Sequence, residues 1–182
     1  MTGREDALAA ATRTYLAGER LDMCDLAREL AISRNTLYRW TGGRERLLQD
    51  VVWELSAKAI QEIWTSTSRR RGASRLREAL RLYLETVVAS EPLHAFLRNE
   101  THAALRLLTA RGPFQDRLVA EVRRLMEAEA DRGTWTPRGD VGTLAYAVVR
   151  LIEGFVYNDA IVQRDTAVDE ALVVIDLLLE SR

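Results

Sequence analysis

The sequence is poor in the residues from which small enzymes and secreted proteins build their sites. Its 182 residues include one cysteine, two histidines and three prolines. The single thiol, Cys24, cannot form an internal disulfide, which is compatible with a reducing compartment. His94 and His102 are eight residues apart, which is about 80° around one continuous helix, so they do not share a face as a metal pair would.

The motifs of common catalytic sites and of membrane segments are also absent. The sequence contains no HExxH, no GxSxG and no phosphate-binding loop, so we expect no enzyme, no metal and no cofactor. It has no run of about 18 apolar residues, and its first twenty residues hold no hydrophobic signal core. We therefore expect a cytoplasmic protein without a membrane partner. A hydrophobic content of 47% and a charged content of 29% are typical of a folded chain.

An excess of basic charge over the whole chain, which a nucleic-acid partner would favour, is missing too. The formal net charge is −1. The charge is unevenly distributed, because residues 33–46 hold four arginines against one glutamate, whereas residues 76–182 hold 13 basic and 17 acidic residues. A small basic segment on an acidic body predicts a local contact with an anionic partner and modest non-specific binding.

This basic segment has the pattern of a short helix with one polar and one apolar side. Ser33 is expected to cap it, and the apolar Leu37 and Trp40 share one face at i, i+3 spacing. The other positions carry hydrogen-bond donors: Arg34, Asn35, Thr36, Tyr38 and Arg39. A preceding helix over 22–30, capped by Asp22, gives the order helix, tight turn, helix.

The stretch LARELAISRNTLYRW, followed by GGRERLL, resembles the DNA-binding domain of TetR-type transcriptional repressors. Ala31 replaces the usual turn glycine, and Trp40-Thr41 replaces the usual His-Phe pair. The resemblance implies a helix-turn-helix that binds double-stranded operator DNA. Donor chemistry assigns base edges to Arg34, Asn35 and Arg39, and phosphates to Thr36, Tyr38 and Arg44, with Ser33 as the cap.

Helical periodicity continues to the end of the chain, and no strand-like alternation of useful length occurs. The expected fold is all-α with about nine helices: a three-helix head carrying the helix-turn-helix on a helical body. The expected domains are a DNA-binding head at 1–48, a linking helix at 44–66, and a ligand-binding and dimerisation body at 73–182. The run 69–71 is interpreted as a solvated linker rather than a second DNA contact.

The last two helices, over 141–162 and 166–179, have more apolar positions than one buried face requires. TetR-type proteins dimerise through their last two helices, and this pattern matches them. The expected interface residues are Leu144, Val148, Leu151, Phe155, Leu172, Ile175 and Leu179. The alternative is a monomer in which the first of these helices is wholly internal.

A polar stripe crosses the first of these two helices. Tyr146, Arg150, Glu153 and Tyr157 recur at i, i+4, i+7 and i+11. Because a buried ion pair contributes little stability, its presence needs another reason. One is a polar anchor, joined by Asn158, in a ligand cavity walled by Phe96 and Trp135. The other is an Arg150–Glu153 pair that satisfies itself or bridges to a partner subunit.

The segments SEPLHAFLRNETHAALRLLTARGPFQ and TLAYAVVRLIEGFVYNDAI resemble the C-terminal domain of TetR-type regulators of lactone-degrading, quorum-quenching genes. This resemblance implies a lactone or a related small amphiphile as the effector. The sequence thus favours a homodimeric, ligand-responsive transcriptional regulator that acts as a repressor. The alternative is a helical ligand-binding or scaffolding protein whose helix-turn-helix contacts other proteins.

Overall fold

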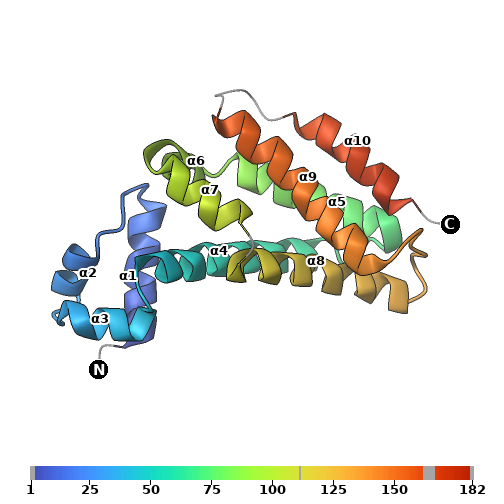
Figure 1. Ribbon diagram of the computed structural model, residues 1–182. Helices are drawn as coiled ribbons and strands as arrows, with labels where there is room; N and C mark the ends of the chain where they lie inside the picture. Colours follow the sequence, from blue (N-terminus) through green and yellow to red (C-terminus); the bar gives the residue numbers. More distant parts are fainter. Residues whose placement is uncertain (1–2, 111, 162–166, 181–182) are drawn as a thin grey trace. The chain divides into compact units, whose positions relative to one another are not determined.

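The computed structural model describes residues 3–110, 112–161 and 167–180, and for residues 158–161 it describes only the backbone. Over these residues the chain forms ten helices and no strand, which confirms the expected all-α class (Figure 1). The helices are α1 (Arg4–Leu16), α2 (Met23–Glu29), α3 (Arg34–Thr41), α4 (Arg44–Ser66), α5 (Gly72–Val88), α6 (Glu91–Asn99), α7 (Thr101–Thr109), α8 (Pro113–Asp131), α9 (Val141–Ile161) and α10 (Val168–Leu179).

The tenth helix arises because the helical periodicity over 93–109, which predicts one helix, is interrupted in the structure and gives two. Glu100 leaves the helical conformation, with φ −138° and ψ 46°, and so separates α6 from α7. His94 and His102 therefore lie on different helices, and the angle computed for one continuous helix does not apply. No cluster of three metal-ligating side chains occurs among the described residues.

The chain divides into two compact units. Unit 1 comprises Met1–Leu55 and Glu91–Phe114, and unit 2 comprises Ser56–Ser90 and Gln115–Arg182. Unit 1 thus contains the first three helices, the start of α4, and both α6 and α7. Residues 91–114, predicted from the sequence to belong to the body, pack with the helices of unit 1.

In unit 1 the helix-turn-helix is held by α1, which contacts both α2 and α3. Ala7, Ala11 and Leu37 are fully buried in its core. On another side α1 contacts α6, where the rings of Tyr15 and Phe96 meet edge to face with their centres 6.0 Å apart. Small residues on α1 let neighbouring helices approach closely, so α2 and α3 pack tightly against α1.

Unit 2 is organised around α5, which packs against α9 and α10 (Figure 1). The buried carboxylate of Glu129 connects three helices of this unit. Glu129, 1% exposed, accepts from the backbone N–H of Gly72 at 2.7 Å and from Arg75 at 3.0 Å. Arg75 in turn lies 3.6 Å from the ring centre of Trp64 and donates to its carbonyl. The end of α4, the start of α5 and the end of α8 are therefore fixed at one point.

Burial acts to raise the pKa of Glu129, but hydrogen bonds outweigh it. The N–H of Gly72, the hydroxyl of Thr134 and the guanidinium of Arg75 all donate to the carboxylate and leave its pKa below the usual range. Gly72 is specifically required, because its φ is +59° and a Cβ there would lie 2.1 Å from the carbonyl oxygen of Thr134.

Candidate functional site

The donor-rich side of α3 is exposed. Ser33 caps the helix as predicted, because its Oγ accepts from the N–H of Thr36 at 3.1 Å. Arg34, Asn35 and Arg39 are exposed, and Tyr38 is 43% exposed. The helix ends at Gly42, whose φ of +72° allows its N–H to reach the carbonyl of Tyr38. α3 therefore presents a short row of donors on a well-terminated helix.

The opposite side of α3 differs in one respect from the prediction. Leu37 is fully buried as expected, but Trp40 is only half-buried, and Thr41, 2% exposed, occupies the core beside Leu37. The hydroxyl of Thr41 donates to the carbonyl of Leu37 at 2.9 Å, which removes the cost of burying it. The turn before α3 places Ala31 at φ +53°, a conformation that is strained for any residue with a Cβ.

The predicted phosphate ligand Arg44 is engaged within unit 1. Its Nη2 donates to both carboxylate oxygens of Glu100 at 2.6 Å, and its Nε donates to the carbonyl of Leu21 at 2.7 Å. Arg20 also approaches Glu100, at 3.8 Å. Since Nε and Nη2 of Arg44 already donate to groups of unit 1, the geometry favours a structural role for this side chain. Its proposed contact with DNA stays a prediction.

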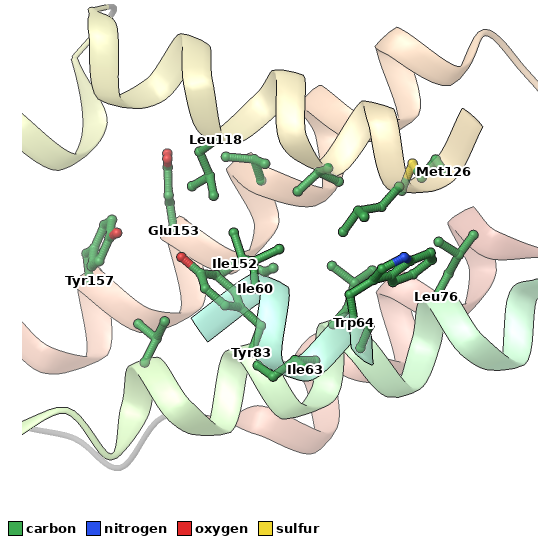
Figure 2. Close-up of a pocket in the computed structure, with 16 residues that line it drawn as sticks. Ile60, Ile63, Trp64, Leu76, Tyr83, Leu118, Met126, Ile152, Glu153 and Tyr157 are labelled. Carbon is green, nitrogen blue, oxygen red and sulfur yellow. The ribbon is translucent and has the colours of Figure 1, made fainter. Parts of the chain in front are cut away.

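Unit 2 contains a mainly apolar cavity of about 40 Å³ (Figure 2). Residues from the second half of α4 and from α5, α8 and α9 enclose it: Ile60, Ile63, Trp64, Leu76, Ala79, Leu80, Tyr83, Val87, Leu118, Val122, Leu125, Met126, Val149, Ile152, Glu153 and Tyr157. Pockets that bind small molecules commonly measure about 300–1,000 Å³. A ligand of that size enters only if the lining helices move apart.

A buried polar network lies beside this cavity. Glu153, 6% exposed, pairs with Arg150 through Nη1 and Oε2 at 3.1 Å. Gln115 of α8 donates to Glu153 and accepts from Arg150, so it bridges the two. Burial raises the pKa of Glu153, while the Gln115 hydrogen bond and the Arg150 charge act in the opposite direction. The pair proposed as the alternative to a ligand anchor forms, yet Glu153 also lines the cavity.

Of the predicted ligand residues whose side chains the structure describes, two, Glu153 and Tyr157, line this cavity. Phe96 packs inside unit 1, and the indole N–H of Trp135 donates to the carbonyl of Leu179. Tyr146 is 49% exposed, with the Arg150 guanidinium 5.3 Å from its ring centre.

Arg150 pairs with Glu153 but is not among the residues that line the cavity. Helical spacing predicts that Tyr146, Arg150 and Glu153 share one face of α9, but of these three residues the cavity lining includes Glu153 alone. Asn158 belongs to the residues whose side chains the structure does not describe.

The prediction missed the walls contributed by α4 and α8. Ile60, Ile63 and Trp64 are spaced as one apolar face of a helix, and so are Leu118, Val122 and Leu125. This periodicity is visible in the sequence. It indicates burial without saying whether the buried face meets other side chains or a cavity.

Four residues of the predicted dimer seam are buried within unit 2. Val148, Leu172, Ile175 and Leu179 are between 0% and 8% exposed, because α10 turns this face toward α5 and α9. The other three, Leu144, Leu151 and Phe155, are half-buried on α9. On α10 the apolar residues left at the surface are Val173, 62% exposed, and Leu177, 59% exposed. The seam predicted on α10 is thus internal, and a different apolar face is exposed.

Residues 71–180 match the family model described as "Tetracyclin repressor-like, C-terminal domain". The structure is similar to that of the R. erythropolis transcriptional repressor QsdR from the TetR family, with 27% identity, a TM-score of 0.89, and coverage of 98% of this chain and 95% of that chain. It also shares the fold of the fatty acid degradation regulator FadR from Bacillus halodurans, at 12% identity, a TM-score of 0.62 and full coverage of both chains.

No curated protein matches the sequence. Among the described residues, every helix is too short or too polar to cross a membrane.

Proposed function

The chain belongs to the TetR family of transcriptional regulators, and we propose that it is a homodimeric repressor released from its operator by a small amphiphile. The family assignment makes it a ligand-responsive DNA-binding regulator and not an enzyme. The observation that carries the proposal is the exposed donor row on α3, a helix that begins at the cap of Ser33 and is anchored by the buried Leu37.

In this proposal α3 enters the major groove. Arg34, Asn35 and Arg39 contact base edges, since their side chains are exposed and can donate to the acceptors of guanine and adenine. Ser33, Thr36 and Tyr38 are proposed to contact the phosphate backbone, and Arg44 would join them only by leaving Glu100. These roles rest on exposure and donor chemistry.

The proposed dimer uses the apolar surface that unit 2 leaves exposed. We assign to it the half-buried Leu144, Leu151 and Phe155 of α9 and the exposed Val173 and Leu177 of α10. An exposed apolar patch on a helical pair is typical of a subunit interface. A two-fold axis through it would supply a second reading helix, and a pseudo-palindromic operator would present half-sites about 34–36 Å apart.

The proposed effector site is the cavity of unit 2. Its walls are largely apolar, Glu153 and two tyrosines contribute its polar groups, and part of its lining comes from α4, which begins directly after the reading helix. The similarity to QsdR favours repression as the sign of regulation. A lactone or a related amphiphile is consistent with such a cavity. Binding that widens the cavity changes the equilibrium between DNA-binding and released states only if affinity differs between them.

The proposal is tested by DNA binding with the purified full chain. Fluorescence anisotropy with the DNA upstream of its own gene should show sequence-dependent binding, with two protomers per site, that weakens when a γ-lactone of eight to ten carbons is added. Binding that is equal for operator and scrambled DNA at low salt would contradict the regulator function. It would favour a helix-turn-helix that contacts proteins.

A further inference from the structure

The oxygen-bearing side chains that line the unit 2 cavity gather at one end, and the indole N–H of Trp64 is the polar group at the other (Figure 2). Figure 2 shows Glu153, Tyr83 and Tyr157 at the first end, while Trp64, Met126 and Leu76 lie at the other. Among the lining residues whose side chains the structure describes, Glu153 is the one with an ionisable carboxyl. An amphiphile that fills the cavity with its chain along the apolar walls therefore places its head group beside Glu153.

Glu153 has room for one more donor. Its carboxylate accepts from Gln115 and from both Nη atoms of Arg150. An ionised carboxylate offers about four acceptor positions, so three donors leave one position for a ligand. The N–H or O–H of a neutral head group can occupy it.

The same position beside Glu153 is unfavourable for an anionic head group. Arg150, the cation nearest to Glu153, directs its Nη atoms to Glu153 and Gln115 and is not part of the cavity lining. A ligand carboxylate would lie next to a buried carboxylate in an apolar surrounding, where the repulsion between like charges is much less screened than in water. Its other neighbours, Tyr83 and Tyr157, offer hydroxyl groups without charge.

We propose that Glu153 is the residue that selects the head group of the effector. It admits apolar chains with a neutral head group, most favourably one that donates a hydrogen bond, and excludes chains that end in a carboxylate. This inference rests on the proposed function, in that it takes the cavity of unit 2 as the effector site.

Octanamide, methyl octanoate and sodium octanoate carry the same apolar chain with three different heads, and their binding can be measured by calorimetry on the full chain at pH 7.5. Octanamide should bind at least about tenfold more tightly than octanoate, because like charges close together in a poorly screened site disfavour the anion. Methyl octanoate, which has no donor, should fall between the two. In Glu153→Gln the ratio between octanoate and octanamide should shrink to within about threefold, since the carboxylate charge is gone.

Two further variants complete the experiment. One tests where the ligand binds, and the other is a control for the loss of one negative charge. Trp64→Phe should abolish the change in tryptophan fluorescence that octanamide binding causes, because Trp64 lines the cavity at the end opposite Glu153. Glu170→Gln, an exposed site on α10 of the same unit, should leave the octanamide-to-octanoate ratio unchanged.

The outcomes separate this inference from the proposed function. Octanoate binding as tightly as octanamide to the unaltered chain would overturn the role of Glu153 and leave the cavity as the effector site. So would an unchanged ratio in a Glu153→Gln variant with unaltered thermal unfolding. A ligand-dependent change in tryptophan fluorescence that persists in Trp64→Phe, or no binding by all three compounds, would overturn the cavity as the effector site and this inference with it, and would leave the proposed DNA-binding function in place.

Discussion

Nη2 of Arg44 lies 2.6 Å from each carboxylate oxygen of Glu100. Arg44 is the first residue of α4, and Glu100 is the residue that separates α6 from α7. The Nε of Arg44 also binds the carbonyl of Leu21, just before the helix-turn-helix. A single side chain thus ties three segments of unit 1 together, with only 26% of its surface exposed.

This relationship predicts the effect of Arg44→Ala. The change leaves the carboxylate of Glu100, 13% exposed, without its main partner, and should lower the free energy of unfolding by about 1.5–3 kcal/mol. Operator affinity should fall, yet the slope of log affinity against log salt should stay the same, because a side chain bound to Glu100 releases no counterion from DNA. Chemical denaturation and anisotropy titrations between 50 and 200 mM salt measure both quantities.

Arg46→Ala is the matched control, since Arg46 is exposed on the same turn of α4. Its variant should keep the unfolding free energy within about 0.5 kcal/mol. If Arg44→Ala instead reduced the magnitude of the salt slope by about 0.9 and left stability unchanged, Arg44 would be a phosphate ligand after all.

The role of Arg34 is predicted from its exposed position in the first turn of α3. Arg34→Ala should weaken specific operator binding by about 1–3 kcal/mol and relax the preference at one base position, because a bidentate contact to a base is lost. Competition with a set of single-base operator variants measures both effects. Arg117→Ala, an exposed arginine of α8, is the control and should change neither. Equal losses at all operator variants would make Arg34 a backbone contact.

Local sequence patterns were sufficient for much of the fold. Ser33 and Asp22 cap their helices as predicted, since a cap needs only a side-chain oxygen two or three residues before a free N–H. The boundaries of α4 and α9 also agree with the periodicity. The break at Glu100 was not predictable, because no glycine or proline marks it and its partner Arg44 is 56 residues away in the sequence.

The candidate sites were less predictable for a related reason. Periodicity shows which face of a helix is buried but not what covers it. Leu172 and Ile175 were assigned to a partner subunit, whereas α5 and α9 of the same unit cover them. For the same reason Phe96 was placed in a ligand cavity, although it packs on Tyr15. Only tertiary contacts distinguish these possibilities.

The buried carboxylate of Glu129 predicts part of the acid sensitivity of the fold. Its pKa in the folded chain lies below the value of about 4.5 expected when unfolded, so it contributes stability that is present above that pH and lost as the pH falls through the folded pKa. Glu129→Gln should lower stability at pH 7, because Arg75 then lacks an anionic partner, and should flatten the loss of stability below about pH 4.5.

Thermal unfolding of both proteins between pH 3 and pH 7 checks this expectation. Glu127→Gln changes a partly exposed carboxylate on the same helix and serves as the control. This variant should lose stability at low pH to the same extent as the unaltered chain. If the Glu129→Gln variant and the unaltered chain lost stability in parallel at every pH, the ionisation of Glu129 would not contribute to the loss of stability at low pH.

The exposed apolar face of unit 2 predicts which residues hold the dimer together. Val173 and Leu177 lie one turn apart on α10 and are 62% and 59% exposed, so replacing one of them should not disturb the core of unit 2. Leu177→Arg should place a charge in the proposed interface and raise the dimer dissociation constant by at least about tenfold, since burying an unpaired charge is costly. Sedimentation equilibrium over a range of protein concentrations measures it.

Operator affinity should fall in parallel, because one protomer contacts only one half-site. Leu16→Arg is the matched control: Leu16 is a 51% exposed leucine on α1 of unit 1 and lies outside the proposed interface. The face would be excluded as the interface if Leu177→Arg remained as dimeric as the unaltered chain, or if both arginine variants dissociated equally.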